Sequence, residues 1–172
     1  MEKYKWLDDL SNFIVEANIK TWAGEGMEVA PERKGFKELE YKKDEWRLRD
    51  SYTGYFRAPG MTTVYYNEKP SWTMAYGGKG QHEGHEGIAK PTFSFLKKAL
   101  KLVTPQMPFR GPSKFSEDGW EYSFFLMKGD ITDFLADEGI TRDRVPVFNQ
   151  IVMGGIVISK DSNRNVVYPW DL

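Results

Sequence analysis

Alternation of apolar and polar residues is the clearest pattern in the chain, and it is strongest between Asp50 and Gly78. In this stretch Trp72, Met74 and Tyr76 fall on one side of an extended segment, and smaller or polar residues fall on the other. A period of two is typical of an antiparallel strand that is buried on one face. Alternation or apolar runs predict strands over Phe36–Tyr41, Glu45–Tyr52, Met61–Tyr66, Ser71–Tyr76, Trp120–Lys128 and Val147–Ile158.

Polar turns connect four of these segments into two hairpins. Lys42-Lys43-Asp44 joins the first pair, and Asn67-Glu68-Lys69-Pro70 joins the second. In the run from 147 to 158, the dipeptide Gly154-Gly155 indicates a bulge or a close approach of another backbone.

Helical spacing of apolar residues predicts two main helices. The first covers residues 4–20, and the second covers residues 91–103, with Pro91 in its first turn. A short helix is predicted over Asp130–Asp137, with Asp130 as its N-cap. The glycine-rich segment 77–90 is predicted to be a flexible loop.

These elements predict an α+β fold: a single domain over residues 1–172, with an antiparallel sheet of about five to seven strands packed by two main helices. Residues 159–172 form a short C-terminal tail, which we expect to dock through Tyr168 and Trp170. Aromatic residues make up 15% of the chain, which favours a thick core or a stacking surface.

Charge and cysteine content exclude several classes of protein. With 24 basic and 25 acidic residues the net charge is -1, so the chain lacks the overall positive charge of a nucleic-acid-binding protein. The absence of cysteine excludes disulfides, thiol catalysis and cysteine metal sites. The charged N-terminus and the lack of a long apolar run predict a soluble, cytoplasmic protein.

Aromatic residues and arginines in irregular segments are the candidates for ligand binding. We expect a pocket formed by Tyr52, Arg57, Trp72, Tyr76 and Arg110, in which aromatic rings stack on the ligand and arginines neutralise an anionic group. The alternative is that the rings fill the core and the arginines form surface ion pairs.

Asp50 is the exception on the apolar face of its strand. It either hydrogen-bonds into the following turn or points into a pocket.

Both histidines of the chain lie in the glycine-rich segment, as His82-Glu83-Gly84-His85-Glu86. Imidazole and carboxylate ligands suit zinc or another divalent metal, so His82 and His85 are the candidate metal ligands. The spacing matches no standard zinc motif, and a solvated or ligand-gating loop is the alternative. No phosphate-binding loop, dinucleotide fingerprint or GxSxG motif is present.

Five segments resemble a bacterial and phage family of domains of unknown function, whose members often follow an Xre-type helix-turn-helix. The similar segments are FIVEANIKTWAGEG, Tyr52 to Phe56, APGMTTVYYNEKPSWTMAYGG, MPFRGP and GGIVI, which together span about residues 7–158. The resemblance implies a sensory or accessory module that binds a small ligand, and it transfers no catalytic residues. The chain departs from the regulator arrangement because it has no helix-turn-helix.

The sequence therefore predicts a non-enzymatic module that binds a small anionic or nucleotide-like ligand, without a cofactor, membrane or nucleic-acid duplex. A sequestering role is a further possibility for such a module. The alternatives are a metal-dependent hydrolase that uses the loop with His82 and His85, and a protein–protein adaptor. An adaptor would expose a large apolar patch rather than an enclosed pocket.

Overall fold

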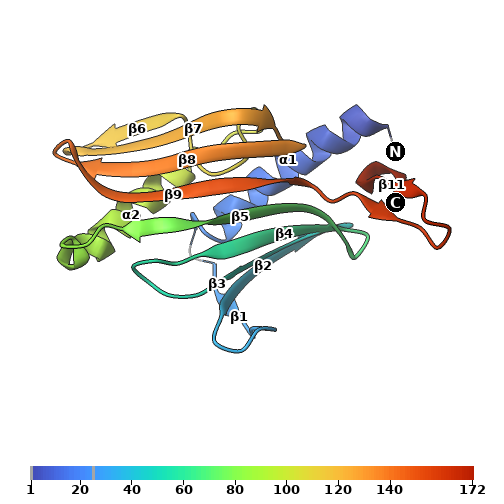
Figure 1. Cartoon of the computed structure of the whole chain (residues 1–172), viewed down its shortest axis with the longest axis horizontal. Helices are drawn as coiled ribbons and strands as arrows, with labels where there is room; N and C mark the ends of the chain where they lie inside the picture. The colour runs from blue at the N-terminus through green and yellow to red at the C-terminus, as the bar shows by residue number, and fades with distance from the viewer. Residues whose placement is uncertain (1, 25) are drawn as a thin grey trace.

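The structure, a computed structural model, describes residues 2–24 and 26–172. Its main feature is a nine-stranded antiparallel sheet with the strand order β1-β2-β3-β4-β5-β9-β8-β7-β6. Its strands are β1 (Glu28–Val29), β2 (Lys37–Lys43), β3 (Trp46–Tyr52), β4 (Gly60–Tyr66), β5 (Lys69–Gln81), β6 (Lys114–Glu117), β7 (Trp120–Asp130), β8 (Asp133–Arg142) and β9 (Val145–Ile156). Two meanders, β1–β5 and β6–β9, meet where β5 pairs with β9 (Figure 1).

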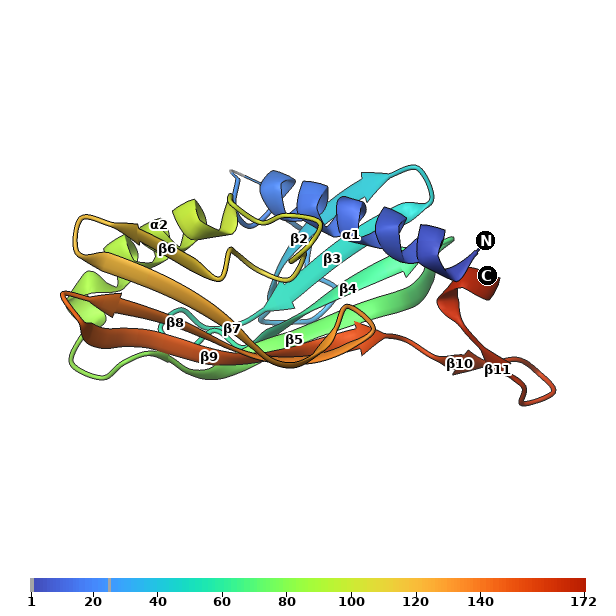
Figure 2. The same ribbon diagram turned by 90° about the horizontal axis from the view of Figure 1, so that it is seen from above.

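The remaining elements are short or helical. They are α1 (Lys3–Lys20), α2 (Ala89–Leu100), the 3-10 turns η1 (Glu86–Ile88) and η2 (Pro169–Asp171), and the strands β10 (Ser159–Lys160) and β11 (Val166–Val167). The strands β10 and β11 form a separate two-stranded sheet. Figure 2 shows both long helices on the same side of the large sheet.

The prediction of an α+β fold with five to seven strands packed by two main helices was wrong, because the chain is mostly sheet. Six predicted strands are present, but the sheet also contains β1, β6 and β8. The predicted helix over Asp130–Asp137 is instead a tight turn followed by β8. Asp130 accepts hydrogen bonds from the backbone and the hydroxyl of Thr132, which closes a turn between strands rather than capping a helix.

The two predicted hairpins are confirmed, with tighter turns than expected. Asn67 and Glu68 both have positive φ, at 49° and 58°, so this hairpin has a two-residue turn whose twist matches its strands. The glycine-rich segment begins as strand: β5 continues to Gln81 and pairs with β9, with a register shift between Gly77 and Gly80. The prediction of a flexible loop over 77–90 was therefore wrong for its first part.

The helix α1 has the amphipathic pattern predicted for it. Its buried residues Trp6, Leu10, Phe13, Ile14 and Ala17 recur at helical spacing and pack on the sheet. Trp170 of the C-terminal segment packs against Trp6, at 6.1 Å between ring centroids, and the two chain ends lie side by side (Figure 1). In the described part of the chain, neither helix is both long enough and apolar enough to cross a membrane.

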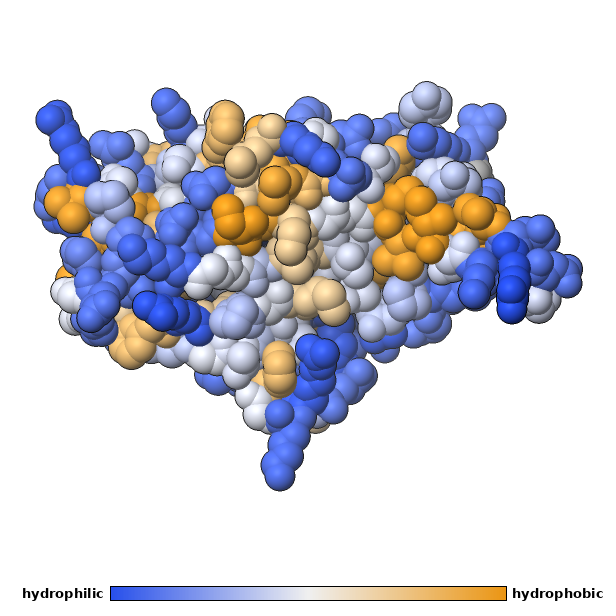
Figure 3. Space-filling view, viewed as in Figure 1, coloured by the Kyte–Doolittle hydropathy of each residue, from blue (hydrophilic) through white to orange (hydrophobic). Residues whose placement is uncertain are grey.

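Only one face of the sheet is covered. On that face Trp72 is fully buried, stacks on Phe134 at 6.0 Å and donates an indole hydrogen bond of 2.9 Å to the carbonyl of Ile131. The opposite face carries exposed apolar side chains, including Phe125 at 67% and Met153 at 54% of full exposure. Figure 3 views the molecule from this face and shows apolar residues gathered in two patches, one in its upper middle and one toward the right.

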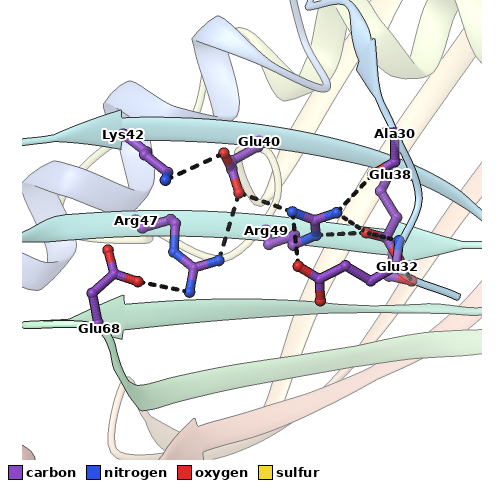
Figure 4. Close-up of polar contacts among 9 residues, drawn as sticks. Ala30, Glu32, Glu38, Glu40, Lys42, Arg47, Arg49 and Glu68 are labelled. Carbon is purple, nitrogen blue, oxygen red and sulfur yellow. Dashed lines mark hydrogen bonds and ion pairs between the residues drawn. The ribbon is translucent and has the colours of Figure 1, made fainter.

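The uncovered face of β2 and β3 carries an ion-pair network (Figure 4). Arg49 pairs with Glu38, with Glu40 at 3.0 Å and with Glu32 at 3.2 Å, while Arg47 bridges Glu40 and a further glutamate. Burial acts to raise the pKa of Glu38, but hydrogen bonds from Arg49, from the Glu32 backbone and from a serine outweigh it and lower the pKa. Polar pairing thus replaces a covering layer on this part of the sheet.

Trp72→Ala should lower the free energy of unfolding by about 3–5 kcal/mol, because it leaves a cavity and removes a buried hydrogen bond. Urea denaturation of the variant and the parent measures the difference. The control Phe125→Ala removes an exposed aromatic ring and should change the free energy of unfolding by about 0.5 kcal/mol or less. Equal losses in the two variants would contradict this description of the core.

Candidate functional site

A chain of buried polar side chains crosses the covered face of the sheet. Asp50 on β3 is fully buried and accepts hydrogen bonds from Thr62 on β4, at 2.6 Å, and from the hydroxyl of Tyr76 on β5, at 3.0 Å. The indole nitrogen of Trp22, which follows α1, also donates to Asp50. Asp50 therefore neither bonds into the turn after its strand nor reaches the surface; it links three elements within the core.

A buried ion pair continues this chain beyond Tyr76. Arg110, in the connection between α2 and β6, bonds to Glu138 on β8 at 3.1 Å, and both side chains are almost completely buried. The hydroxyl of Tyr122 donates to Glu138 at 2.8 Å, and the amide of Gln150 donates to its other oxygen. The carboxylate thus has the additional donors that a buried ion pair needs.

Trp22 joins the two halves of the polar chain. Its ring lies 5.0 Å from the Arg110 guanidinium, 5.9 Å from the ring of Tyr76 and 5.6 Å from the ring of Tyr52. The guanidinium also lies 5.3 Å from the Tyr76 ring, so two aromatic faces surround the buried cation. Indole, tyrosine and guanidinium groups therefore fix one another in position.

A pocket of about 560 Å³ opens next to Trp22. It lies where the residues after α1, the edge of β2–β3, the loop 53–59 and one face of α2 meet. The lining residues are Trp22, Lys37, Tyr52, Gly54, Tyr55, Ala58, Lys90, Phe93, Ser94, Leu96 and Lys97. We call it the aromatic–lysine pocket, because four aromatic side chains and three lysines line it, and none of its lining residues among 2–24 and 26–172 is acidic.

Two of the three lysines carry charge that nothing in the described chain neutralises. Lys37 pairs with Glu28 at 3.3 Å, whereas Lys90 and Lys97 have no ion-pair partner among residues 2–24 and 26–172. Both lie on α2, seven residues apart, so they project from the same side of the helix. The pocket therefore presents uncompensated positive charge beside aromatic faces.

Three of the five predicted ligand-binding residues come together at this place. Tyr52 lines the aromatic–lysine pocket, while Tyr76 and Arg110 lie beneath it in the buried polar chain. Trp72 lies in the core, stacked on Phe134. Arg57 is exposed and lines a separate pocket.

His82 and His85 lie between the end of β5 and α2. No group of three or more His, Cys, Asp or Glu side chains suited to a metal is found in the part of the chain that the structure describes. Burial is the main cause that lowers the pKa of His82, and the nearby charges of Lys79 and His85 add to it. A metal site at these histidines stays a prediction.

Sequence reasoning missed Trp22 and the pocket lysines. A signal for α2 was present: Lys90, Phe93, Ser94 and Lys97 have the spacing i, i+3, i+4 and i+7 of one helix face. Only the apolar row of this helix was used to predict it. Trp22 gave no such signal, because it lies in a short irregular segment whose contacts come from distant strands.

Comparison with protein families identifies the larger part of the chain. Residues 50–157 match the model of a family described as a domain of unknown function (DUF5680), and the chain belongs to this family. The matched region contains the polar chain from Asp50 to Glu138 and the α2 side of the pocket, while Trp22 and Lys37 lie before it. No curated protein and no solved structure matches the chain.

Arg110→Met should lower the free energy of unfolding by about 3–5 kcal/mol, because Glu138 would stay buried without its counter-charge. Urea denaturation measures the loss. The control Lys98→Met removes one partner of an exposed ion pair, with Glu117, and should have little effect. A small loss for Arg110→Met would show that Glu138 does not depend on this partner.

Asp50 should make stability depend on pH. Burial raises its pKa above the ordinary 3.8, although hydrogen bonds from Thr62, Trp22 and Tyr76 act against the shift. The folded state then holds the proton more tightly than the unfolded state, so the contribution of Asp50 is present below 3.8 and is lost as pH rises through the raised pKa. The Asp50→Asn variant lacks this titration.

Urea denaturation of the parent and Asp50→Asn at pH values from about 3 to about 8 tests this expectation. As pH rises, the parent should lose stability relative to the variant. A difference that stays constant over this range would contradict it.

Proposed function

We propose that this domain is a non-enzymatic module that binds a small anionic ligand with a planar group, such as a nucleotide, in the aromatic–lysine pocket. The observation that carries the proposal is the combination of four aromatic side chains with three lysines around about 560 Å³ of space. Ligand pockets for small molecules usually have volumes of about 300–1,000 Å³ and few, well-placed polar groups.

The aromatic and lysine side chains of the pocket would bind different parts of the ligand. Tyr52, Tyr55, Phe93 and Trp22 offer aromatic faces for a planar group. Lys90 and Lys97 offer ammonium groups for a phosphate or carboxylate, since neither has an ion-pair partner among the described residues.

Preorganisation supports this assignment. The Trp22 indole is fixed by its hydrogen bond to Asp50 and by its contact with Arg110, so binding does not have to order this wall of the pocket. The two lysines lie on the regular helix α2, which fixes the spacing of their backbone atoms. A ligand would order mainly the lysine side chains.

The resemblance to bacterial and phage domains that follow Xre-type helix-turn-helix segments suggests how such binding is used. A domain of this kind acts as a sensory or accessory module, or sequesters a ligand. In each of these roles the domain acts by binding its ligand, and no catalytic group is required.

Titration of the purified protein with AMP, adenosine and inorganic phosphate tests the proposal. AMP should bind more tightly than adenosine by about tenfold or more, because its phosphate reaches the lysines. The double variant Lys90→Met/Lys97→Met should raise the Kd for AMP by about tenfold, measured by calorimetry and by the ligand-induced shift in Tm.

Lys101→Met is the matched control. It removes one positive charge, where the double variant removes two, just beyond the end of α2 at a residue that does not line the pocket, and it should leave AMP binding unchanged. If Lys101→Met weakens AMP binding as much as the double variant does, the effect comes from the net charge of the protein and not from the pocket lysines. Absence of binding by AMP and by other nucleoside monophosphates would overturn the nucleotide assignment.

The uncovered face of the sheet favours a second candidate function, that of a protein–protein adaptor. Met61, Ala75, Met153 and Leu135 oppose one another across four neighbouring strands, and Phe125 and Ile151 are exposed nearby. Exposed apolar patches often mark protein interaction sites. An adaptor would respond to Met153→Glu and be insensitive to Lys90→Met/Lys97→Met, the reverse of what the ligand-binding module predicts.

A further inference from the structure

A second pocket, of about 400 Å³, lies on the other side of the loop 53–59. Its lining residues are Tyr55, Phe56, Arg57, Gln81, Glu83 and Glu86. Tyr55 alone also lines the aromatic–lysine pocket. The charges differ as well, because this pocket has one arginine and two glutamates in place of three lysines. We call it the Arg57 pocket.

The loop that carries Arg57 is seated on the end of β5 by glycine. Gly80 has a φ of +62°, and a Cβ atom there would lie 2.5 Å from the carbonyl oxygen of Phe56. The backbone N–H of Gln81 donates to that same oxygen at 2.7 Å. Gly54 permits a similarly close approach, since a Cβ atom there would lie 2.2 Å from the carbonyl oxygen of Arg57. The loop is thus tightly folded at Gly54 and held against the end of β5 through the Phe56 carbonyl.

The charged side chains of this pocket do not form ion pairs with one another. Neither Arg57 nor Glu83 has an ion-pair partner in the described chain. Glu86 accepts a hydrogen bond of 3.1 Å from the Gly84 backbone, and backbone N–H groups of Glu86 and Gly84 lower its pKa, so it is a carboxylate at neutral pH. A cationic group and two anionic groups therefore line one small space.

Gln81 adds a buried acceptor. Its side-chain nitrogen donates to the carbonyl of His85 at 3.0 Å and to the hydroxyl of Thr92 at 3.4 Å, and that hydroxyl donates onward to Ile88. These partners fix the orientation of the amide. Its oxygen is left without a partner among the described residues, although only 3% of the residue is exposed. A buried acceptor without a donor is unfavourable, so a ligand N–H at this place would be stabilising.

We propose that the Arg57 pocket is a separate binding site for a small zwitterion, namely an α-amino acid with an apolar or aromatic side chain. Arg57 would hold the carboxylate, for which its planar guanidinium offers two parallel N–H groups. Glu83 and Glu86 would bind the ammonium group, and Gln81 would accept one of its N–H groups. The rings of Tyr55 and Phe56, whose centroids are 4.9 Å apart, would contact the side chain.

Three related compounds separate these contributions. L-phenylalanine carries both charges, phenethylamine lacks the carboxylate, and 3-phenylpropionate lacks the ammonium group. Calorimetric titration of the full chain should give a Kd for L-phenylalanine at least about tenfold lower than for either analogue. Equal affinity for all three compounds, or no binding of L-phenylalanine, L-tyrosine, L-leucine or L-methionine, would overturn the proposal.

Variants assign the contributions to residues. Arg57→Met should bring the Kd of L-phenylalanine to that of phenethylamine, and Glu83→Gln should weaken binding of the amino acid and of phenethylamine but not of 3-phenylpropionate. Both residues are exposed, so these variants should fold, and their Tm values without ligand verify it. Arg33→Met, at an exposed arginine outside the pocket, is the charge control and should leave binding unchanged.

The two binding sites can fail independently. Arg57→Met should leave AMP binding intact, and Lys90→Met/Lys97→Met should leave L-phenylalanine binding intact. If Arg57→Met weakens AMP binding as strongly as it weakens L-phenylalanine binding, the two pockets form one site and the proposal of a separate amino-acid site is wrong.

Discussion

The buried ion pair between Arg110 and Glu138 is the interaction on which the covered face of the sheet depends. Arg110 comes from the long connection between α2 and β6, and Glu138 comes from the middle of β8. Burial of either charge without the other would be strongly unfavourable. The ion pair therefore forms only when the connection between α2 and β6 lies on the sheet. Asn18 of α1 adds a weaker tie at 3.5 Å to the Phe109 carbonyl of the same connection. The ion pair thereby determines where the irregular part of the covering layer sits.

The arrangement of the pocket follows from that position. Trp22 contacts the Arg110 guanidinium on one side and donates to Asp50 on another, so the chain after α1 is fixed over β3 and β5. The helix α2 and the loop 53–59 complete the enclosure. The aromatic wall of the pocket is therefore an extension of the core, while its lysines belong to the surface.

Sequence patterns were informative wherever burial alone determines structure. The alternation in Ser71–Tyr76 and in Trp120–Lys128 reflects one buried face, and both segments are strands. The strand β8 was missed because Glu138 occupies a core position and Gly139 follows it, which breaks the apolar period that would have predicted a strand. Its register is stabilised by pairing with β7 and β9 and by Arg110, all distant in sequence. Of the candidate site residues, Tyr52, Tyr76 and Arg110 were brought together by the same long-range contacts, which spacing along the chain does not reveal.

Arginine–glutamate pairing has different consequences on the two faces of the sheet. On the uncovered face, Arg49 contacts three carboxylates, so several partners share its charge, although its side chain is only 13% exposed and Glu38 is buried. Loss of one partner there leaves others in place. On the covered face, Glu138 is fully buried and Arg110 is its only cationic partner among the described residues. Removal of that guanidinium leaves the carboxylate with neutral donors alone. The two networks therefore differ in redundancy: Arg49 has three carboxylate partners, whereas Glu138 has one cationic partner among the described residues, so the pair on the covered face depends on a single contact.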